Sequence, residues 1–286
     1  MPTGSWKADY YRINGFRQFC RAWKPIAASG LPVLALHGSL TQSGMWIALA
    51  ERAGSISMTC PDHRGFGRSE DPGVDACAEF ASDAVAVAKK LLPPRYVVMG
   101  HSFACTIALQ AARRAGGQAV AVVLVDPVVP MGNAAAAVKT PPVAPPESFA
   151  TLEACERHFR DSEEGDWSND ALRRFVQDIV MRDEGGPWRF PYASGRLRRL
   201  RAFTASPQSD YDLFAEAKAA RCPVLVFRGA MSKRFPASAE RPFLDAFRSK
   251  PRIVLCPKSG HFPTATDTNI IATELKRFLQ DLPESR

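Results

Sequence analysis

The sequence lacks the long apolar segments that would tie it to a membrane. No run of about 18 apolar residues occurs along the 286 residues, so we expect no membrane-spanning helix and no membrane partner. The first seven residues carry no apolar segment of the kind found in a secretory signal. There are no internal repeats. Together these absences predict a globular protein of the cytoplasm.

The sequence also lacks the motifs of disulfide-bonded, metal-binding and phosphate-binding proteins. Its seven cysteines are spread singly without a C-x-x-C pair, and the count is odd. This pattern predicts reduced, mostly buried thiols in a reducing compartment. The histidines show no metal-binding spacing such as H-x-x-x-H, and there is no glycine-rich phosphate loop. We therefore expect neither a metal ion nor another cofactor.

Acidic residues are too few to balance the basic ones: 37 Lys and Arg against 29 Asp and Glu give a net charge of +8. Such an excess suits a nucleic acid, an acidic partner or an anionic substrate. No helix-turn-helix, zinc finger or basic-aromatic RNA motif accompanies it, so we expect no nucleic-acid partner. A basic segment at 196–201 hints at an anionic ligand, although a solvated face is the favoured interpretation. Whether the chain forms a homodimer is left open.

One stretch, residues 96–109, combines a strand and a helix with almost nothing between them. Residues 96–99 form a short apolar run typical of a buried strand, and apolar residues at helical spacing follow from Phe103. The string G-H-S-F-A at 100–104 must therefore turn sharply. A serine at the tip of such a turn projects its hydroxyl beside the first free N–H groups of the helix. This predicts that Ser102 is a nucleophile, the alternative being an ordinary N-cap serine.

Around this stretch, short apolar runs alternate with amphipathic segments, which predicts an α/β fold with a mostly parallel central sheet flanked by helices. The chain opens with two antiparallel strands joined at Asn14-Gly15, a pair that favours a hairpin. Further strands are expected at 31–36, 56–61, 96–99, 119–125, 223–229 and 252–256, and helices at 75–92, 103–114, 236–247 and 267–282. Ligands bind beyond the carboxyl ends of parallel strands, so we expect the site there.

Three motifs carry a resemblance to a known superfamily. An H-G turn at His37-Gly38 ends one predicted strand, the string D-x-R-G-x-G-x-S covers residues 62–69, and the G-H-S elbow lies at 100–102. Their order and approximate spacing resemble those of the α/β-hydrolase superfamily, in which the nucleophile stands on such an elbow. The resemblance implies an α/β-hydrolase fold with an inserted helical cap, and a loop at 62–69 that is mainly architectural.

The cap has a recognisable place in the chain. The alternation of strands and helices stops after the predicted strand 119–125 and resumes at 223–229. The resemblance interprets the interruption, which carries two helical patterns of its own, as the cap. We therefore predict a core domain of residues 1–129 and 218–286 and a helical cap of residues 130–217.

The resemblance also assigns roles to particular residues. His261, in the Ser-Gly-His-Phe-Pro string after the last predicted strand, matches the histidine that accepts the proton of the nucleophile Ser102. In this superfamily a turn after an early strand and the residue after the nucleophile form the oxyanion hole. This implies that the backbone N–H groups of Ser39 and Phe103 hold the oxyanion.

Three further residues, His37, Trp46 and His101, are candidate substrate contacts. Each lies close in sequence to the predicted oxyanion turn or to the elbow. For His37 the alternative is a structural histidine that hydrogen-bonds its own loop, and this alternative is the favoured one.

The acid that should orient the histidine is missing from its usual place. In most relatives an Asp follows the seventh strand, but here Lys233 stands in that region and no carboxylate occurs between Arg228 and Pro236. A lysine cannot accept a hydrogen bond from the histidine. The best replacement is Asp126, after the sixth strand, where haloalkane dehalogenases and cofactor-free ring-cleaving dioxygenases place the acid. The alternative is a structural strand-end residue, and a hydrogen bond between Asp126 and His261 would decide.

These residues predict a serine hydrolase of the esterase, thioesterase or lactonase class. Its substrate is expected to be a small molecule with an ester, thioester, lactone or activated carbon–carbon bond. Two alternatives stay open. In a cofactor-free dioxygenase, the His261–Asp126 pair would deprotonate the substrate and Ser102 would only help to bind it. In a non-catalytic relative, to which Lys233 points, the pocket would bind a ligand without turnover.

Overall fold

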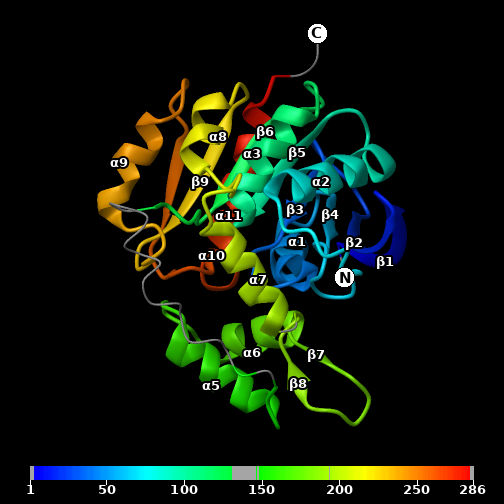
Figure 1. Cartoon of the computed structure of the whole chain (residues 1–286). Helices are drawn as coiled ribbons and strands as arrows, with labels where there is room; N and C mark the ends of the chain where they lie inside the picture. Colours follow the sequence, from blue (N-terminus) through cyan, green and yellow to red (C-terminus); the bar gives the residue numbers. More distant parts are fainter. Residues whose placement is uncertain (1–2, 131–145, 147, 193, 284–286) are drawn as a thin grey trace.

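An eight-stranded sheet forms the centre of this computed structural model, which describes residues 3–130, 146, 148–192 and 194–283 (Figure 1). The strand order is β1-β2-β4-β3-β5-β6-β9-β10. The strands β1 and β2 pair antiparallel, as do β2 and β4, and all other neighbours in this sheet are parallel. The strands are β1 (Gly4–Ile13), β2 (Phe16–Pro25), β3 (Val33–Leu36), β4 (Met58–Pro61), β5 (Tyr96–His101), β6 (Ala119–Val125), β9 (Val224–Gly229) and β10 (Arg252–Cys256). The predicted fold class is therefore confirmed.

The first two strands form the predicted hairpin. Asn14 and Gly15 have positive φ angles of 44° and 90°, as a two-residue turn between twisted antiparallel strands requires. The turn sets Ile13 opposite Phe16, and the pairing continues without a shift to Gly4 and Pro25. Local sequence alone thus determines this edge of the sheet.

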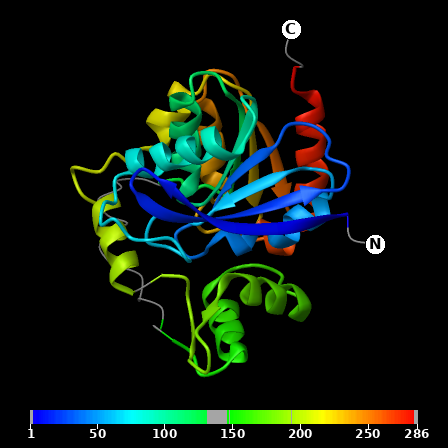
Figure 2. The same cartoon turned by 90° about the vertical axis from the view of Figure 1, so that its right-hand side faces the viewer.

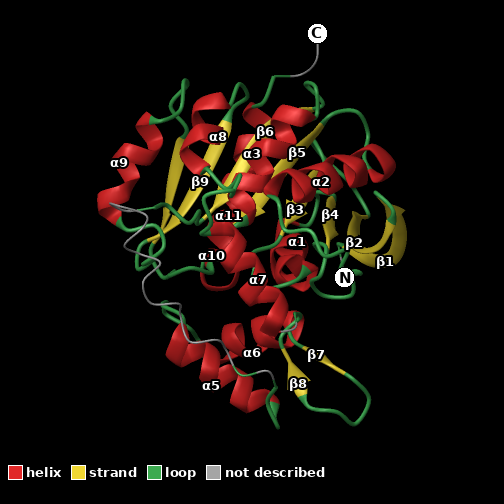
Figure 3. Cartoon of the chain, in the orientation of Figure 1, coloured by secondary structure: helices red, strands yellow, loops and turns green. Residues whose placement is uncertain are grey.

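Helices cover both faces of the sheet (Figures 2 and 3). Along β5, the side chains of Val97 and Met99 pack into one core and that of Val98 into the other, because successive residues of a strand face opposite sides. None of the described helices is both long and apolar enough to cross a membrane. One face carries α2 (Cys77–Leu91), α3 (Ala104–Arg114), α8 (Leu213–Ala219) and α9 (Ala237–Asp245); the other carries η1 (Ser43–Trp46), α1 (Ile47–Ala53), α10 (Pro263–Thr266) and α11 (Thr268–Asp281).

Between β6 and β9 the chain leaves the sheet and forms a helical insertion, drawn below the sheet in Figure 1. Its elements are α5 (Leu152–Ser162), α6 (Asn169–Ile179), β7 (Met181–Arg182), β8 (Trp188–Arg189) and α7 (Ser194–Thr204). The limits 130–217 of the cap stay a prediction. Residues 131–145, 147 and 193 of that range lie outside the described residues, and residue 217 falls within α8, which packs against α3.

Two arginines of α7 hold the insertion against the sheet domain. The buried guanidinium of Arg196 forms an ion pair with Asp75 and lies 5.0 Å from the ring centroid of Phe66. Arg199 forms ion pairs with Asp71 at 2.7 Å and with Asp75 at 2.8 Å. The interpretation of this basic segment as a solvated face is therefore wrong for Arg196. Its side chain is buried, and the carboxylate of Asp75, in the loop before α2, pairs with it there.

Buried polar groups organise the loop at residues 62–69. The carboxylate of Asp62 accepts hydrogen bonds from the backbone N–H groups of Ser43 at 2.7 Å and Arg68 at 2.9 Å. Arg64 forms an ion pair at 2.7 Å with Asp83 of α2, and both side chains are almost completely buried. These contacts connect the loop to η1 and α2, which is an architectural role.

We expect Arg64→Met to lower the free energy of unfolding by about 3–5 kcal/mol, because it leaves the buried carboxylate of Asp83 without its charged partner. The matched control is Arg17→Met, whose ion pair with Glu70 is exposed to 60% and 54%. Loss of that pair should cost about 1 kcal/mol or less. Urea denaturation followed by circular dichroism measures both variants, and equal losses would contradict the structural role of Arg64.

Candidate active site

Ser102 stands on a sharp turn between β5 and α3. Its φ angle is 58°, in the left-handed region that only a few non-glycine residues occupy. Gly100 makes the turn possible, since a Cβ atom there would lie 2.2 Å from the carbonyl oxygen of Ala104. The strained turn directs the side chain of Ser102 away from the sheet edge and into a cavity.

The structure brings Ser102, His261 and Asp126 together in one hydrogen-bonded series. The Oγ of Ser102 lies 2.8 Å from Nε2 of His261, and Nδ1 of the same ring lies 2.7 Å from Oδ2 of Asp126. The three residues follow β5, β10 and β6, whose carboxyl ends meet at one edge of the sheet. All three are buried. The hydrogen bond between Asp126 and His261 that the sequence left undecided is present.

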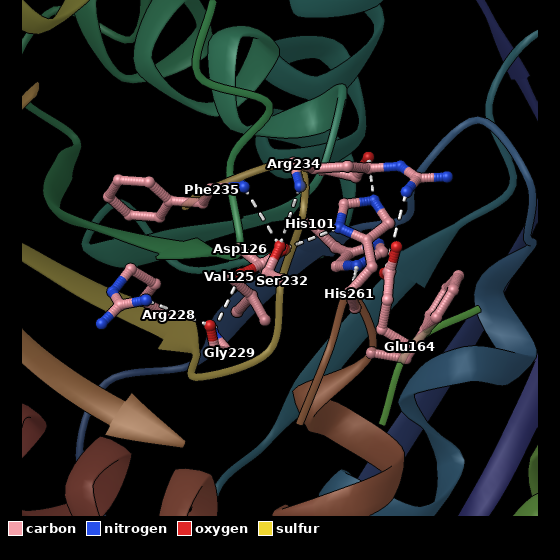
Figure 4. Close-up of polar contacts among 12 residues, drawn as sticks. His101, Val125, Asp126, Glu164, Arg228, Gly229, Ser232, Arg234, Phe235 and His261 are labelled. Carbon is pink, nitrogen blue, oxygen red and sulfur yellow. Dashed lines mark hydrogen bonds and ion pairs between the residues drawn. The ribbon is translucent and has the colours of Figure 1, made fainter. Parts of the chain in front are cut away.

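Asp126 receives further hydrogen bonds from the end of β9 and from the loop that follows it (Figure 4). The N–H of Gly229 donates to Oδ1 at 2.9 Å, and the hydroxyl of Ser232 donates to Oδ2 at 2.6 Å. Lys233, in the region where the acid was expected, is 80% exposed and pairs with Glu164 at 3.4 Å. The loop that carries the acid in most relatives therefore supplies hydrogen-bond donors to an acid on the neighbouring strand.

The protonation states of this series follow from burial and from neighbouring charges. Burial raises the pKa of Asp126 to about 6, while the bonds from Ser232 and Gly229 oppose the rise. Burial lowers the pKa of His261 well below its usual value, and the positive charge of Arg234 lowers it further. At neutral pH, Asp126 is therefore a carboxylate and His261 a neutral ring. Since the carboxylate only accepts, Nδ1 donates to it, and Nε2 is left to accept the proton of the serine hydroxyl.

A cavity of about 440 Å³ opens beside Ser102. The insertion contributes one wall through α7, while the loops after β3, β5 and β9 contribute others. The polar lining consists of hydroxyl-bearing, histidine and arginine side chains, and apolar side chains make up the rest. The apolar lining includes Leu40, Phe103, Val128, Leu200 and Phe262. No group of three or more His, Cys, Asp or Glu side chains suited to a metal ion occurs in the described part of the chain.

The predicted oxyanion donors, Ser39 and Phe103, both line this cavity. Among the described residues, the backbone N–H of neither residue donates a hydrogen bond to a protein group. The N–H of Phe103 is free because it precedes the first turn of α3. Gly38 lets the loop approach closely, since a Cβ atom there would lie 2.7 Å from Nδ1 of His101. Their role in holding an oxyanion stays a prediction.

Of the three candidate substrate contacts, only His101 lines the cavity. His37 is completely buried: its Nδ1 lies 2.7 Å from the carbonyl oxygen of Gly38, and its Nε2 accepts the N–H of His63 at 2.9 Å. Both ring nitrogens are thus used within the loop. Trp46 is also completely buried, because η1 packs it into the core on the face of the sheet that α1 and α11 cover. The expectation that His37 and Trp46 contact the substrate is corrected accordingly.

His101 contacts the loop that carries the base. Its Nε2 donates to the carbonyl oxygen of His261 at 2.7 Å. Burial lowers the pKa of His101 to about 3, so the ring is neutral at physiological pH. His101 therefore helps to position His261 from the elbow itself.

The sequence did not single out Ser232, Arg234 or Arg201 as residues of the site. Ser232 and Arg234 follow β9, and no local pattern marks a residue whose partner is 106 positions away. Arg201 lines the cavity from α7. A signal for it existed in the basic segment 196–201, but only the packing of α7 decides which of its arginines faces the cavity.

Comparisons with known proteins find relatives along most of the chain. Residues 33–272 match the model of a family described as "Alpha/beta hydrolase family". The chain is 33% identical over 119 residues to the monoglyceride lipase homolog of Monkeypox virus, covering 39% of this chain and 43% of that protein. It is 32% identical over 97 residues to lipase LipV of Mycobacterium tuberculosis, covering 34% and 37%. The matches thus span less than half the length of either relative.

Among solved structures, that of E-2-(acetamidomethylene)succinate hydrolase is similar over almost the whole chain. The TM-score is 0.81, with 96% of this chain and 100% of that chain covered. The sequence identity is 21%, so this similarity concerns the fold alone.

We expect Ser232→Ala to lower the free energy of unfolding by about 1–3 kcal/mol, because the buried carboxylate of Asp126 loses a donor. The same hydroxyl also accepts the N–H groups of Arg234 and Phe235. Ser29→Ala is the control, because the Ser29 hydroxyl donates to the hydroxyl of Ser55 at the surface and, within the described residues, bonds to nothing else. Its loss should change stability little. Denaturant titration of both variants measures the difference. A Ser232 variant as stable as the control would contradict its support of Asp126.

Proposed function

The chain belongs to the alpha/beta hydrolase family, and from this premise we propose that it is a serine hydrolase that cleaves small ester-type substrates. The observation that carries the proposal is the series of hydrogen bonds from Ser102 through His261 to Asp126, at 2.8 and 2.7 Å. A serine hydroxyl needs such a base, because it is a weak nucleophile when protonated. The names of the two relatives, a monoglyceride lipase homolog and a lipase, support an ester bond as the target.

The reaction proceeds in two halves. Ser102 Oγ attacks the carbonyl carbon while His261 Nε2 takes its proton, and Asp126 stabilises the imidazolium that forms. The negative charge that develops on the carbonyl oxygen is held by the N–H groups of Ser39 and Phe103. His261 then gives the proton to the leaving alcohol, which departs. Water, activated by the same ring, releases the acid from the serine and restores the hydroxyl.

A dioxygenase that needs no cofactor is the second candidate, and the position of Asp126 after β6 favours it. There the His261–Asp126 pair would remove a proton from a hydroxylated heteroaromatic substrate before oxygen reacts with it. Against it stands the hydrogen bond that His261 Nε2 makes with Ser102. The ring nitrogen that would have to remove the proton of a dioxygenase substrate is therefore already bonded to the serine hydroxyl, as a hydrolase requires.

We expect a fluorophosphonate probe to label the protein on Ser102, and Ser102→Ala to lose both labelling and ester hydrolysis. The fall in turnover should be about 10⁴-fold or more, since the nucleophile itself is removed. Ser39→Ala is the matched control: it removes a hydroxyl from the same cavity but keeps the backbone N–H. Mass spectrometry of the labelled peptide and release of acid from short-chain esters provide the two measurements.

The outcomes separate the two candidates. Labelling that survives in Ser102→Ala would remove the hydrolase assignment. Oxygen uptake with a hydroxylated heteroaromatic substrate, retained in Ser102→Ala and lost in His261→Ala, would establish the dioxygenase instead.

We expect the acid limb of kcat/KM for ester hydrolysis to lie below pH 6.5, because burial and Arg234 lower the pKa of His261. Activity is lost as pH falls and the ring takes up a proton. Removing the positive charge with Arg234→Gln raises the pKa of His261, so the limb should move to higher pH. Lys233→Gln, which removes an exposed charge from the adjacent position, should leave the limb in place. A limb that stays fixed in Arg234→Gln would contradict the electrostatic coupling.

A further inference from the structure

We propose that the cavity selects esters that carry a carboxylate, and that Arg201 binds this carboxylate while the ester carbonyl lies at Ser102. The inference rests on the proposed hydrolase function and adds the substrate class to it. One cavity of about 440 Å³ is lined both by Arg201 of α7 and by the nucleophile Ser102.

The charges around this cavity have one sign. Arg201 and Arg234 line it, and no Asp or Glu belongs to its lining in the described part of the chain. The two lining histidines do not add charge, because burial lowers the pKa of both His101 and His261. Which of the two arginines is available to a negatively charged substrate depends on the carboxylates that contact each of them.

Arg234 already has counter-charges. Its guanidinium lies 3.3 Å from Glu163 and 3.9 Å from Glu164, two carboxylates at the end of α5 and just beyond it. Figure 4 shows Arg234 beside His261, with its side chain directed toward Glu164. Arg234 therefore acts on the electrostatics of the base and is not the free cation of the cavity.

Arg201 differs from Arg234 in having no carboxylate in direct contact, since Glu163 acts on it only from beyond ion-pair distance. Among the described residues, no carboxylate lies within 4.0 Å of its guanidinium, and the guanidinium donates no hydrogen bond to a protein group. The side chain is only partly exposed, and burial lowers its pKa. A desolvated, unpaired charge is unfavourable, and a carboxylate with its matching pair of oxygens compensates it best.

The other arginines of α7 show that this situation is specific to Arg201. Arg196 and Arg199 pair with Asp71 and Asp75 and anchor the helix. Arg198 is exposed to solvent. Only Arg201, one turn further along the helix, reaches the cavity. Because the anchoring pairs hold α7 in place, the position of Arg201 relative to the nucleophile is determined before a substrate binds.

The apolar part of the cavity lining suits a short carbon chain. Leu200, Val128 and Phe262 line the cavity together with Arg201 and Ser102. Such a lining accepts methylene groups, while the charged end and the carbonyl end each meet a polar partner. A monoester of a short dicarboxylic acid, or an acyl ester of a hydroxy acid, has this arrangement of groups.

The test compares charged esters with uncharged partners of the same shape. Monoethyl succinate, glutarate and adipate, and the acetyl esters of hydroxy acids, are each paired with the analogue in which an amide replaces the carboxylate. We expect the wild-type protein to prefer the charged member of at least one pair by about 10- to 100-fold in kcat/KM, the range for a charge-assisted hydrogen-bonded pair.

Arg201→Gln should abolish this preference by lowering kcat/KM for the charged ester while that for the amide partner changes less than about threefold. Arg201→Lys should restore part of the preference, because the charge returns without the planar pair of donors. Arg198→Gln, on the exposed side of the same helix, is the control and should keep the wild-type preference. Titration calorimetry of glutarate into Ser102→Ala gives a second readout that needs no turnover, with binding expected there and lost on adding Arg201→Gln.

The outcomes that overturn the proposal are distinct from those that overturn the hydrolase. Equal hydrolysis of charged and uncharged esters by the wild-type protein, or an equal loss for both in Arg201→Gln, would refute the carboxylate subsite and leave the hydrolase standing. Absence of fluorophosphonate labelling at Ser102 would refute the hydrolase itself.

Discussion

Burial of the carboxylate of Asp126 is the constraint on which the site depends. This group is completely shielded from solvent, and a buried charge is stable only where hydrogen bonds replace water. It receives three: from Gly229 at the end of β9, from Ser232 after β9, and from His261 after β10. The hydrogen bonds to this one carboxylate therefore connect the carboxyl ends of β6, β9 and β10. The orientation of His261 toward Ser102 follows from that arrangement.

The acid follows β6 and not β9, after which the resemblance places it in most relatives. Gly229 at the end of β9 donates an N–H to this acid, and Ser232 in the next loop donates a hydroxyl. Lys233 then turns to solvent and pairs with Glu164. The positive φ of Asp126, 45°, accompanies this exchange. Aspartate is among the few side chains that tolerate such a backbone conformation, so the substitution is compatible with a strand end.

The helix α7 connects the insertion with the chemistry of the core. Its arginines differ in function although they are neighbours in sequence: Arg196 and Arg199 attach the helix through Asp71 and Asp75, while Arg201 lines the cavity. Arg196 and Arg199 therefore attach the helix by charge, while Arg201 lines the cavity that also holds the nucleophile. Anchoring and substrate selection thus depend on the same short element.

The sequence by itself determined the hairpin at Asn14-Gly15, the strands, most helices, and the elbow at Ser102, because turn residues and apolar periodicity act over a few positions. It also pointed to His261 and Asp126. Only the tertiary structure decided that these two share a hydrogen bond across 135 positions, that Ser232 supports the acid, that His37 and Trp46 are packed away from the cavity, and that Arg201 faces it. Such contacts depend on how strand ends and helices pack in space, and no spacing along the chain encodes them.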